Sequence, residues 1–481
     1  MLLILAFRHL WVRKVRSLFL LFGFAIGVGV MVVLLSVGEA MLDQSRDVSL
    51  VGGGEVTILP QGIDIEAMRT GGAGGMFFSI ERAPFLTRQA LGGKRHAGVV
   101  RAVSPAIEGK LVYICKTTGG GQCRPTAVRA GGEIPSRAAA VGAGLDVLQG
   151  RWADSPADSG YIAPSRQRLY DELDRFHVPR RPDSTWAEWQ YYNVVVAPDE
   201  WWYVTYLVGG AVPTGRWGGR VLITRRRPDG RYERFTAEVP GSPEMFDTMK
   251  ADLTLGPSTV RQRDGVYALH ALARGEAGLA TIDLAVRPAP ERYFPAVELR
   301  EEALLSGYVV PALAGSATGT VCVAGRCRSL RDALAYHDHN WGVWRDVTWE
   351  WGAARGASLA LLYGGVYTGE DAGSPFFLSL VDSLGVRQIL RFNTIHYQGS
   401  IPAAGLLGAV APREFELHAA RLDDTVRLHV DVSDAVASRA GLGGGPRDFV
   451  QMRGRFRVEG KVSGTAIADT GSGFFETYLR R

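Results

Sequence analysis

One short run in the carboxyl-terminal half of the chain holds the densest set of groups that could transfer protons. Residues 336–342 read Tyr-His-Asp-His-Asn-Trp-Gly, inside a stretch whose pattern predicts a β-strand. Because side chains alternate between the two faces of a strand, His337, His339 and Trp341 should share one face, opposite Asp338 and Asn340. Burying such groups is costly unless they are hydrogen-bonded. The run therefore predicts a polar site within a β-sheet.

Two blocks of the sequence resemble one known family. Asp338-His339-Asn340-Trp341-Gly342 resembles the signature of the carotenoid 1,2-hydratase (hydroxyneurosporene synthase) and AttH-like family. Residues 188–193, Glu-Trp-Gln-Tyr-Tyr-Asn, are similar to a segment that opens the first barrel of that family. The match runs over about residues 160–481. The resemblance implies a mainly β protein with two consecutive lipocalin-like antiparallel β-barrels.

The resemblance also implies a chemistry that needs no redox cofactor. Its reaction is the addition of water to a carbon–carbon double bond, or a related cyclisation or isomerisation of a long apolar substrate. An acid must protonate the alkene, and aromatic faces must stabilise the cation. Asp338 or protonated His339 is the expected acid, because burial raises the pKa of a carboxyl. Asn340 would orient the acid or the water, and Trp341 with Tyr363 or Tyr367 would stabilise the cation. The side chains expected to contact the ligand are Tyr336, His337, Trp349, Trp351, Trp189 and Tyr191.

The same run has two alternative interpretations. It could be a hydrogen-bonded plug that closes a barrel, with its tryptophan in the core. His337 and His339 could instead chelate a metal ion with His396 from another predicted strand, but further ligands stay unassigned, and we predict no metal. Tyr363 and Tyr367 lie beside glycines, without the neighbouring Asp expected of a full hydratase site. Carotenoid itself is therefore not the expected substrate.

Composition indicates a globular chain of two or three domains. The 481 residues are 46% hydrophobic and 21% charged, and 60 Gly and 23 Pro suit the many turns of an all-β architecture. The net charge of +5 comes from scattered arginines rather than a basic stripe. We therefore expect no nucleic-acid partner.

The amino-terminal segment predicts a membrane anchor. Residues 18–37 are almost wholly apolar and long enough to span a bilayer. Basic residues precede them, so the positive-inside rule predicts a single-pass inner-membrane protein with its bulk in the periplasm. A cleaved signal peptide is the alternative, although its apolar region normally has about 7–15 residues. Residues 7–40 also resemble the first membrane helix of macrolide-exporter-type ABC permeases, which implies ABC transporter subunits as partners. A complete transporter is excluded, because the sequence has no phosphate-binding loop and no later apolar stretch of sufficient length.

Four cysteines stand in two close pairs. Cys322 and Cys327 bracket a four-residue segment that reads as a hairpin turn, so they should face each other across the strands. Cys115 and Cys123 bracket a glycine-rich loop that could close in the same way. We predict two disulfides, which persist in oxidising compartments such as the periplasm. Four unpaired thiols are the alternative.

These observations predict five segments and two competing functions. The expected segments are a cytoplasmic tip and transmembrane anchor (1–45), a small permease-periplasmic-like α+β segment (46–150), a connector (151–185), a first barrel (186–310) and a second barrel with the signature (311–481). The favoured function is to bind or hand over a lipophilic, isoprenoid- or acyl-like molecule beside an ABC exporter. The alternative is a hydratase, cyclase or isomerase that protonates a C=C bond.

Overall fold

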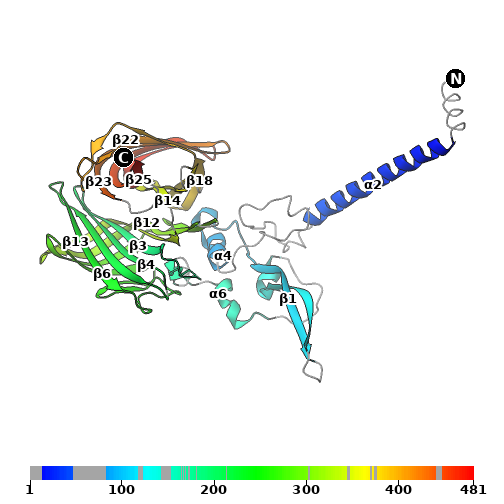
Figure 1. Ribbon diagram of the computed structural model, residues 1–481, viewed down its shortest axis with the longest axis horizontal. Helices are drawn as coiled ribbons and strands as arrows, with labels where there is room; N and C mark the ends of the chain where they lie inside the picture. The colour runs from blue at the N-terminus through cyan, green and yellow to red at the C-terminus, as the bar shows by residue number, and fades with distance from the viewer. Residues whose placement is uncertain are drawn as a thin grey trace. The chain divides into compact units, whose positions relative to one another are not determined.

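The computed structural model describes four stretches of the chain: residues 14–46, 83–117, 123–141 and 153–480. Short gaps within the last stretch fall at 164, 166, 168–169, 172–173, 180, 213, 302–303, 344–346, 369–370, 373–375 and 440–446. The chain forms two units, Met1–Leu91 with Gly98–Pro164, and Gly92–Ala97 with Ser165–Arg481 (Figure 1). The predicted tip at 1–13 and residues 47–82 of the predicted α+β segment lie outside the described residues.

In its described residues, the first unit has helices and one β-hairpin. Its strands β1 (Ala106–Thr117) and β2 (Cys123–Glu133) pair antiparallel. Its longest helix, α2 (Lys14–Arg46), carries exposed apolar side chains. No helix in the described part of the chain has both the length and the hydropathy of a membrane span. The predicted anchor is therefore not confirmed. The shorter helices are α4 (Ala83–Gly92), α5 (Pro135–Ala140), η4 (Pro156–Asp158) and α6 (Ser159–Ile162), while η3 (Lys94–His96) belongs to the second unit.

The second unit begins with a closed barrel of eight antiparallel strands, as counted in its described residues. In β3 (Trp186–Ala197), Trp186, Glu188, Gln190 and Tyr192 are buried and alternate with half-buried residues, the period of two that makes a strand. The other barrel strands are β4 (Glu200–Gly210), β5 (Trp217–Arg226), β6 (Tyr232–Pro240), β9 (Val266–Gly275), β10 (Gly278–Pro288), β12 (Leu304–Val323) and β13 (Arg326–Val343). Strands β7 (Leu253–Leu255), β8 (Ser258–Arg263) and β11 (Phe294–Glu301) extend this sheet.

A second closed barrel of eight described strands follows. The ring closes where β14 (Val347–Gly356) pairs with β15 (Ala360–Thr368). The remaining barrel strands are β17 (Phe376–Asp382), β18 (Gly385–Phe392), β22 (Glu414–Arg421), β23 (Asp424–Arg439), β24 (Arg447–Val462) and β25 (Thr465–Arg480). Short strands β16 (Asp371–Ala372), β19 (Ile395–Gln398), β20 (Ile401–Pro402) and β21 (Val410–Ala411) lie outside this ring. The prediction of a mainly β protein with two consecutive barrels is confirmed.

The boundary between the barrels differs from the predicted one near residue 310. Strand β13, which contains the signature, pairs with β12 on one side and with β3 on the other. It therefore closes the first barrel, and the prediction that it belongs to the second barrel is wrong. The junction falls between Val343 and Val347, where β13 ends and β14 begins. Hydrophobic periodicity indicates where a strand lies, but not which distant strand completes its hydrogen bonds.

The outer faces of the two barrels pack against each other through aromatic side chains. Tyr308 of the first barrel lies edge-on to Trp351 of the second, with ring centroids 5.1 Å apart. Phe294 of β11 stacks on Phe377 at 5.2 Å. An ion pair between Arg226 and Asp434, at 2.7 Å, also links the barrels. We call this contact region the seam.

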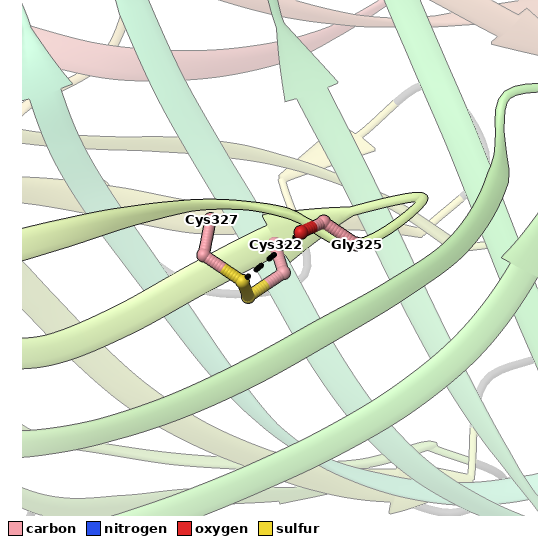
Figure 2. The surroundings of a disulfide bond; sticks show 3 residues. All are labelled: Cys322, Gly325 and Cys327. Carbon is pink, nitrogen blue, oxygen red and sulfur yellow. Dashed lines mark hydrogen bonds between the residues drawn. A yellow bond between two sulfur atoms is a disulfide. The ribbon is translucent and has the colours of Figure 1, made fainter.

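The predicted hairpin disulfide is present. Cys322 and Cys327 oppose each other across the β12–β13 turn and are covalently joined (Figure 2). Cys115 is also disulfide-bonded. The side chain of Cys123, its predicted partner, lies outside the described set.

Candidate functional site

The alternation of β13 separates the signature into two clusters, as its sequence predicts. His337, His339 and Trp341 face the interior of the first barrel and are fully buried. The indole of Trp341 lies over Gly307 of β12, where a Cβ would come within 2.1 Å of the ring, so the position opposite the indole requires glycine. Asp338 points the other way, into the seam. One strand therefore supplies two chemically separate sites.

The inner cluster centres on His339, which lies between two buried carboxylates. Its Nδ1 is 2.7 Å from Asp174 Oδ1, and its Nε2 is 2.8 Å from Glu188 Oε1. Burial disfavours the charged ring, but hydrogen bonds to both carboxylates outweigh burial and raise the pKa of His339 to about 10. His339 is therefore an imidazolium that donates to both neighbours at neutral pH.

The remaining atoms of these carboxylates also have partners. Asp174 Oδ2 lies 3.1 Å from Nε2 of His337, whose Nδ1 faces the carbonyl oxygen of Tyr191. The backbone N–H of His177 donates to both oxygens of Glu188 at 2.8 Å. Burial alone would raise the pKa of Asp174 and of Glu188, but the histidine partners hold both pKa values below the usual range. The inner cluster is thus a saturated ionic network and a poor proton donor.

The outer cluster centres on Asp338, a residue that is only 3% exposed. Asn340 Nδ2 donates to Asp338 Oδ1 at 2.6 Å, and the Tyr336 hydroxyl also bonds to this carboxyl. Trp351 Nε1 of the second barrel donates to the Tyr336 hydroxyl at 3.0 Å. Burial raises the pKa of Asp338 well above its usual range, and the negative charge of Glu476 adds to this effect. Asp338 therefore keeps its proton to a higher pH than an ordinary carboxyl does.

A second carboxyl reaches the seam from the other barrel. Glu476 of β25 accepts hydrogen bonds from Gln451 at 2.9 Å and from the Trp349 indole at 3.2 Å. Burial raises the pKa of Glu476 too. Gln451 also lies 3.5 Å from the hydroxyl of Tyr191 in the first barrel. The seam thus holds two protonatable carboxyls, one from each barrel, among amides and aromatic rings.

The structure gathers most of the predicted ligand residues at the seam. Trp189 contacts Trp349 with ring centroids 6.2 Å apart, and Tyr191 contacts Tyr336 at 6.5 Å. The predicted residues at the seam are Asp338, Asn340, Tyr336, Trp349, Trp351, Trp189 and Tyr191.

Other predicted residues lie elsewhere. Tyr363 is inside the second barrel, stacked on Phe475, so it cannot act together with Trp341 inside the first. The structure does not bring these two side chains together, because β13 and β15 expose their inner faces to different barrel cores. The side chain of Tyr367 lies outside the described set. His396, the third metal ligand considered, is exposed on β19 and does not join His337 and His339.

Sequence reasoning missed several buried ionisable groups. Asp174 and His177 lie in the segment taken as a connector, and Glu476 lies in the last strand. Glu350 lies inside the second barrel, where it accepts from Tyr397 at 2.7 Å, and burial raises the pKa of Glu350 to about 8. Acidic residues between tryptophans, as in residues 349–351, were the signal that could have pointed to a buried acid.

Comparison with known proteins finds solved structures of similar shape. No family model and no curated protein matches the chain. A crystal structure of a putative AttH from Nitrosomonas europaea is similar at 16% identity and a TM-score of 0.44, covering 69% of this chain and 98% of that one. Kievitone hydratase from Nectria haematococca is similar at 11% identity and a TM-score of 0.41, covering 65% of this chain and 96% of that one. CghA with Sch210972 is similar at 12% identity and a TM-score of 0.41, covering 66% of this chain and 97% of that one. At these values function must be argued from the site itself.

Fold and site together define a class. The described residues of the second unit form two consecutive eight-stranded antiparallel barrels, with buried carboxyls in the seam between their outer faces. The resemblance of the amino-terminal segment to an ABC permease stays a prediction.

Proposed function

We propose that the protein is an acid–base enzyme of the hydratase, cyclase or isomerase type, with Asp338 as its general acid. The substrate class is an apolar, unsaturated molecule of isoprenoid or acyl character. The observation that carries this proposal is the buried Asp338 carboxyl, whose pKa is raised by burial and which lies between the aromatic outer faces of two barrels. A neutral carboxylic acid near pH 7 is the group that protonation of an alkene needs.

The hydrogen bonds around Asp338 suit the transfer of its proton. The acid gives its proton to one alkene carbon, the π electrons form the new C–H bond, and a cation remains on the other carbon. Tyr336 and Asn340 then donate to the carboxylate that forms, and Trp351 keeps the Tyr336 hydroxyl aimed at it. Water adds to the cation and returns one proton to Asp338, so the acid is regenerated.

Aromatic side chains beside Asp338 suit a cationic intermediate. Tyr308, Trp349 and Trp351 are each only partly buried, so their rings leave surface for a ligand. A cation over an aromatic face gains about 0.5–2 kcal/mol. The indole N–H groups of Trp349 and Trp351 already have acceptors, so these rings are held in place.

Isotope incorporation tests the proposal directly. The purified chain is incubated in D₂O with polyprenyl and polyene test substrates, and products are analysed by mass spectrometry. We expect carbon-bound deuterium, and Asp338→Asn should lower the rate by about 10²–10⁴-fold. Glu350→Gln is the matched control, since it removes another buried carboxyl from the interior of the second barrel. Full turnover by Asp338→Asn would refute the assignment.

A binding function without chemistry is the competing outcome. It predicts that lipids extracted from the parent protein and from Asp338→Asn are the same and chemically unchanged. The aromatic seam supports this second candidate as well, because it offers apolar surface to a ligand. Hand-over beside an ABC exporter, a periplasmic location and membrane attachment stay predictions.

A further inference from the structure

Three residues of the inner cluster converge in a way that the proposed acid chemistry does not use. One ring nitrogen each of His177 and His339 and a carboxylate oxygen of Glu188 all lie within 4.8 Å of one another. Glu188 Oε1 is 2.8 Å from His339 Nε2 and 3.3 Å from His177 Nδ1. We call these residues the inner triad. They come from the loop before β3, from β3 itself and from β13.

We propose that the inner triad binds one divalent transition-metal ion, of which Zn²⁺ is the representative. Two imidazole nitrogens and one carboxylate oxygen form a donor set that Zn²⁺ and its neighbours in the first transition row accept. Ca²⁺ and Mg²⁺ prefer oxygen donors alone, so this set disfavours them.

Groups behind the triad are arranged as the supporting shell of a metal site. Metal-bound histidines commonly donate their other ring N–H to a carboxylate. His339 Nδ1 lies 2.7 Å from Asp174, which leaves Nε2 directed at Glu188. The ring of His177 lies flat on Trp341, with centroids 3.7 Å apart and planes 8° from parallel. Both imidazoles are thus held in fixed orientations before an ion arrives.

Charge and access also favour a cation here. Asp174 and Glu188 are both fully buried, and imidazoles of His337 and His339 contact their carboxylate oxygens. On binding, a divalent ion would replace the proton on His339 Nε2, which is released to water, so the ring becomes neutral and the two positive charges of the ion balance Asp174 and Glu188. The His177 side chain is 19% exposed, whereas Glu188 is 0% exposed, so an ion and a fourth ligand such as water can approach from the His177 side. The ion would tie the loop before β3 to two strands of the barrel.

Metal titration of the full chain tests this site. Chelator-treated protein receives Zn²⁺ in a calorimeter and Co²⁺ in a spectrophotometer, where bound Co²⁺ reports its ligands by visible absorption. We expect one equivalent bound by the parent and at least a tenfold loss of affinity in His177→Ala and Glu188→Gln. His429→Ala is the matched control, because Glu414, His429 and Asp431 form a similar but more exposed group. Its affinity should equal that of the parent.

Thermal unfolding separates lost binding from a lost fold. Zn²⁺ should raise the Tm of the parent and of His429→Ala, but not that of His177→Gln, which keeps much of the side-chain volume. Failure of the parent to bind one equivalent would overturn the proposal, as would unchanged affinity in both His177 variants. The inner triad would then be an ion-pair network only.

Discussion

The two faces of β13 stabilise buried polar groups in opposite ways. On the inner face, His339 and the carboxylates Asp174 and Glu188 keep their charges because each ion has a counter-ion within hydrogen-bonding distance. On the outer face, the Asp338 carboxyl has Asn340 and Tyr336, both neutral, as hydrogen-bond partners, and burial raises its pKa well above the usual range. Adjacent residues of one strand thus lie in opposite electrostatic environments.

This difference separates a structural role from a chemical one. A saturated ion network resists proton loss, because any transfer leaves an uncompensated buried charge. A neutral buried acid can release a proton once a substrate accepts it. We therefore assign proton transfer to the seam, and ion or metal binding to the interior of the first barrel.

The largest expected effect is on the inner face. Asp174→Ala removes the partner of both His337 and His339, so the free energy of unfolding should fall by about 3–5 kcal/mol. Denaturant unfolding of chelator-treated protein measures this loss. Asp338→Asn keeps the shape and hydrogen-bonding capacity of the outer face, so it should cost far less. Equal losses in the two variants would remove the distinction between the faces.

Asp338→Asn should have a smaller effect than Asp174→Ala, and at neutral pH it should stabilise the folded chain rather than destabilise it. The pKa of Asp338 in the folded chain is raised above its unfolded value of 3.8, so folding is most favourable below that value and weakens as pH rises toward the folded pKa. Asp338→Asn lacks this group and should be more stable than the parent at pH 7–8, but not near pH 3.

Glu350 provides an independent check, because its raised pKa should change stability with pH in the same direction as that of Asp338. Its pKa rises from 4.5 to about 8, so its stabilising contribution should be lost between these values. Glu350→Gln should flatten the stability profile in this window without loss of activity. If the pH profiles of stability for Asp338→Asn and Glu350→Gln run parallel to that of the parent, these carboxyls are ionised in the folded chain.

The smallest effect is expected for the second-barrel partner of the acid. Trp351→Phe keeps an aromatic ring but removes the N–H that donates to Tyr336 at 3.0 Å. A neutral hydrogen bond contributes about 0.5–1.5 kcal/mol, so turnover should fall by roughly tenfold or less, and the alkaline limb of the pH–rate profile should shift. A loss as large as that of Asp338→Asn would mean that the ring, not the hydrogen bond, is essential.

Local patterns predicted much of this molecule. The alternation in residues 336–342 placed His337 and Asp338 on opposite faces, as the structure has them. The spacing of Cys322 and Cys327 predicted their hairpin bridge. Both features depend only on strand geometry over a few residues.

Partners that come from distant parts of the chain could not be predicted in this way. His339 meets Asp174, 165 residues away, and Trp351 of one barrel meets Tyr336 of the other. The barrel boundary was misplaced for the same reason, because β13 pairs with β3 from the start of the second unit.

The amino-acid sequence alone determined the strands, the faces on which their side chains lie and the concentration of proton carriers in one run. Only the tertiary structure decided which of those carriers are charged. A pKa depends on burial and on counter-ions brought together by chain closure, and no local pattern records that environment.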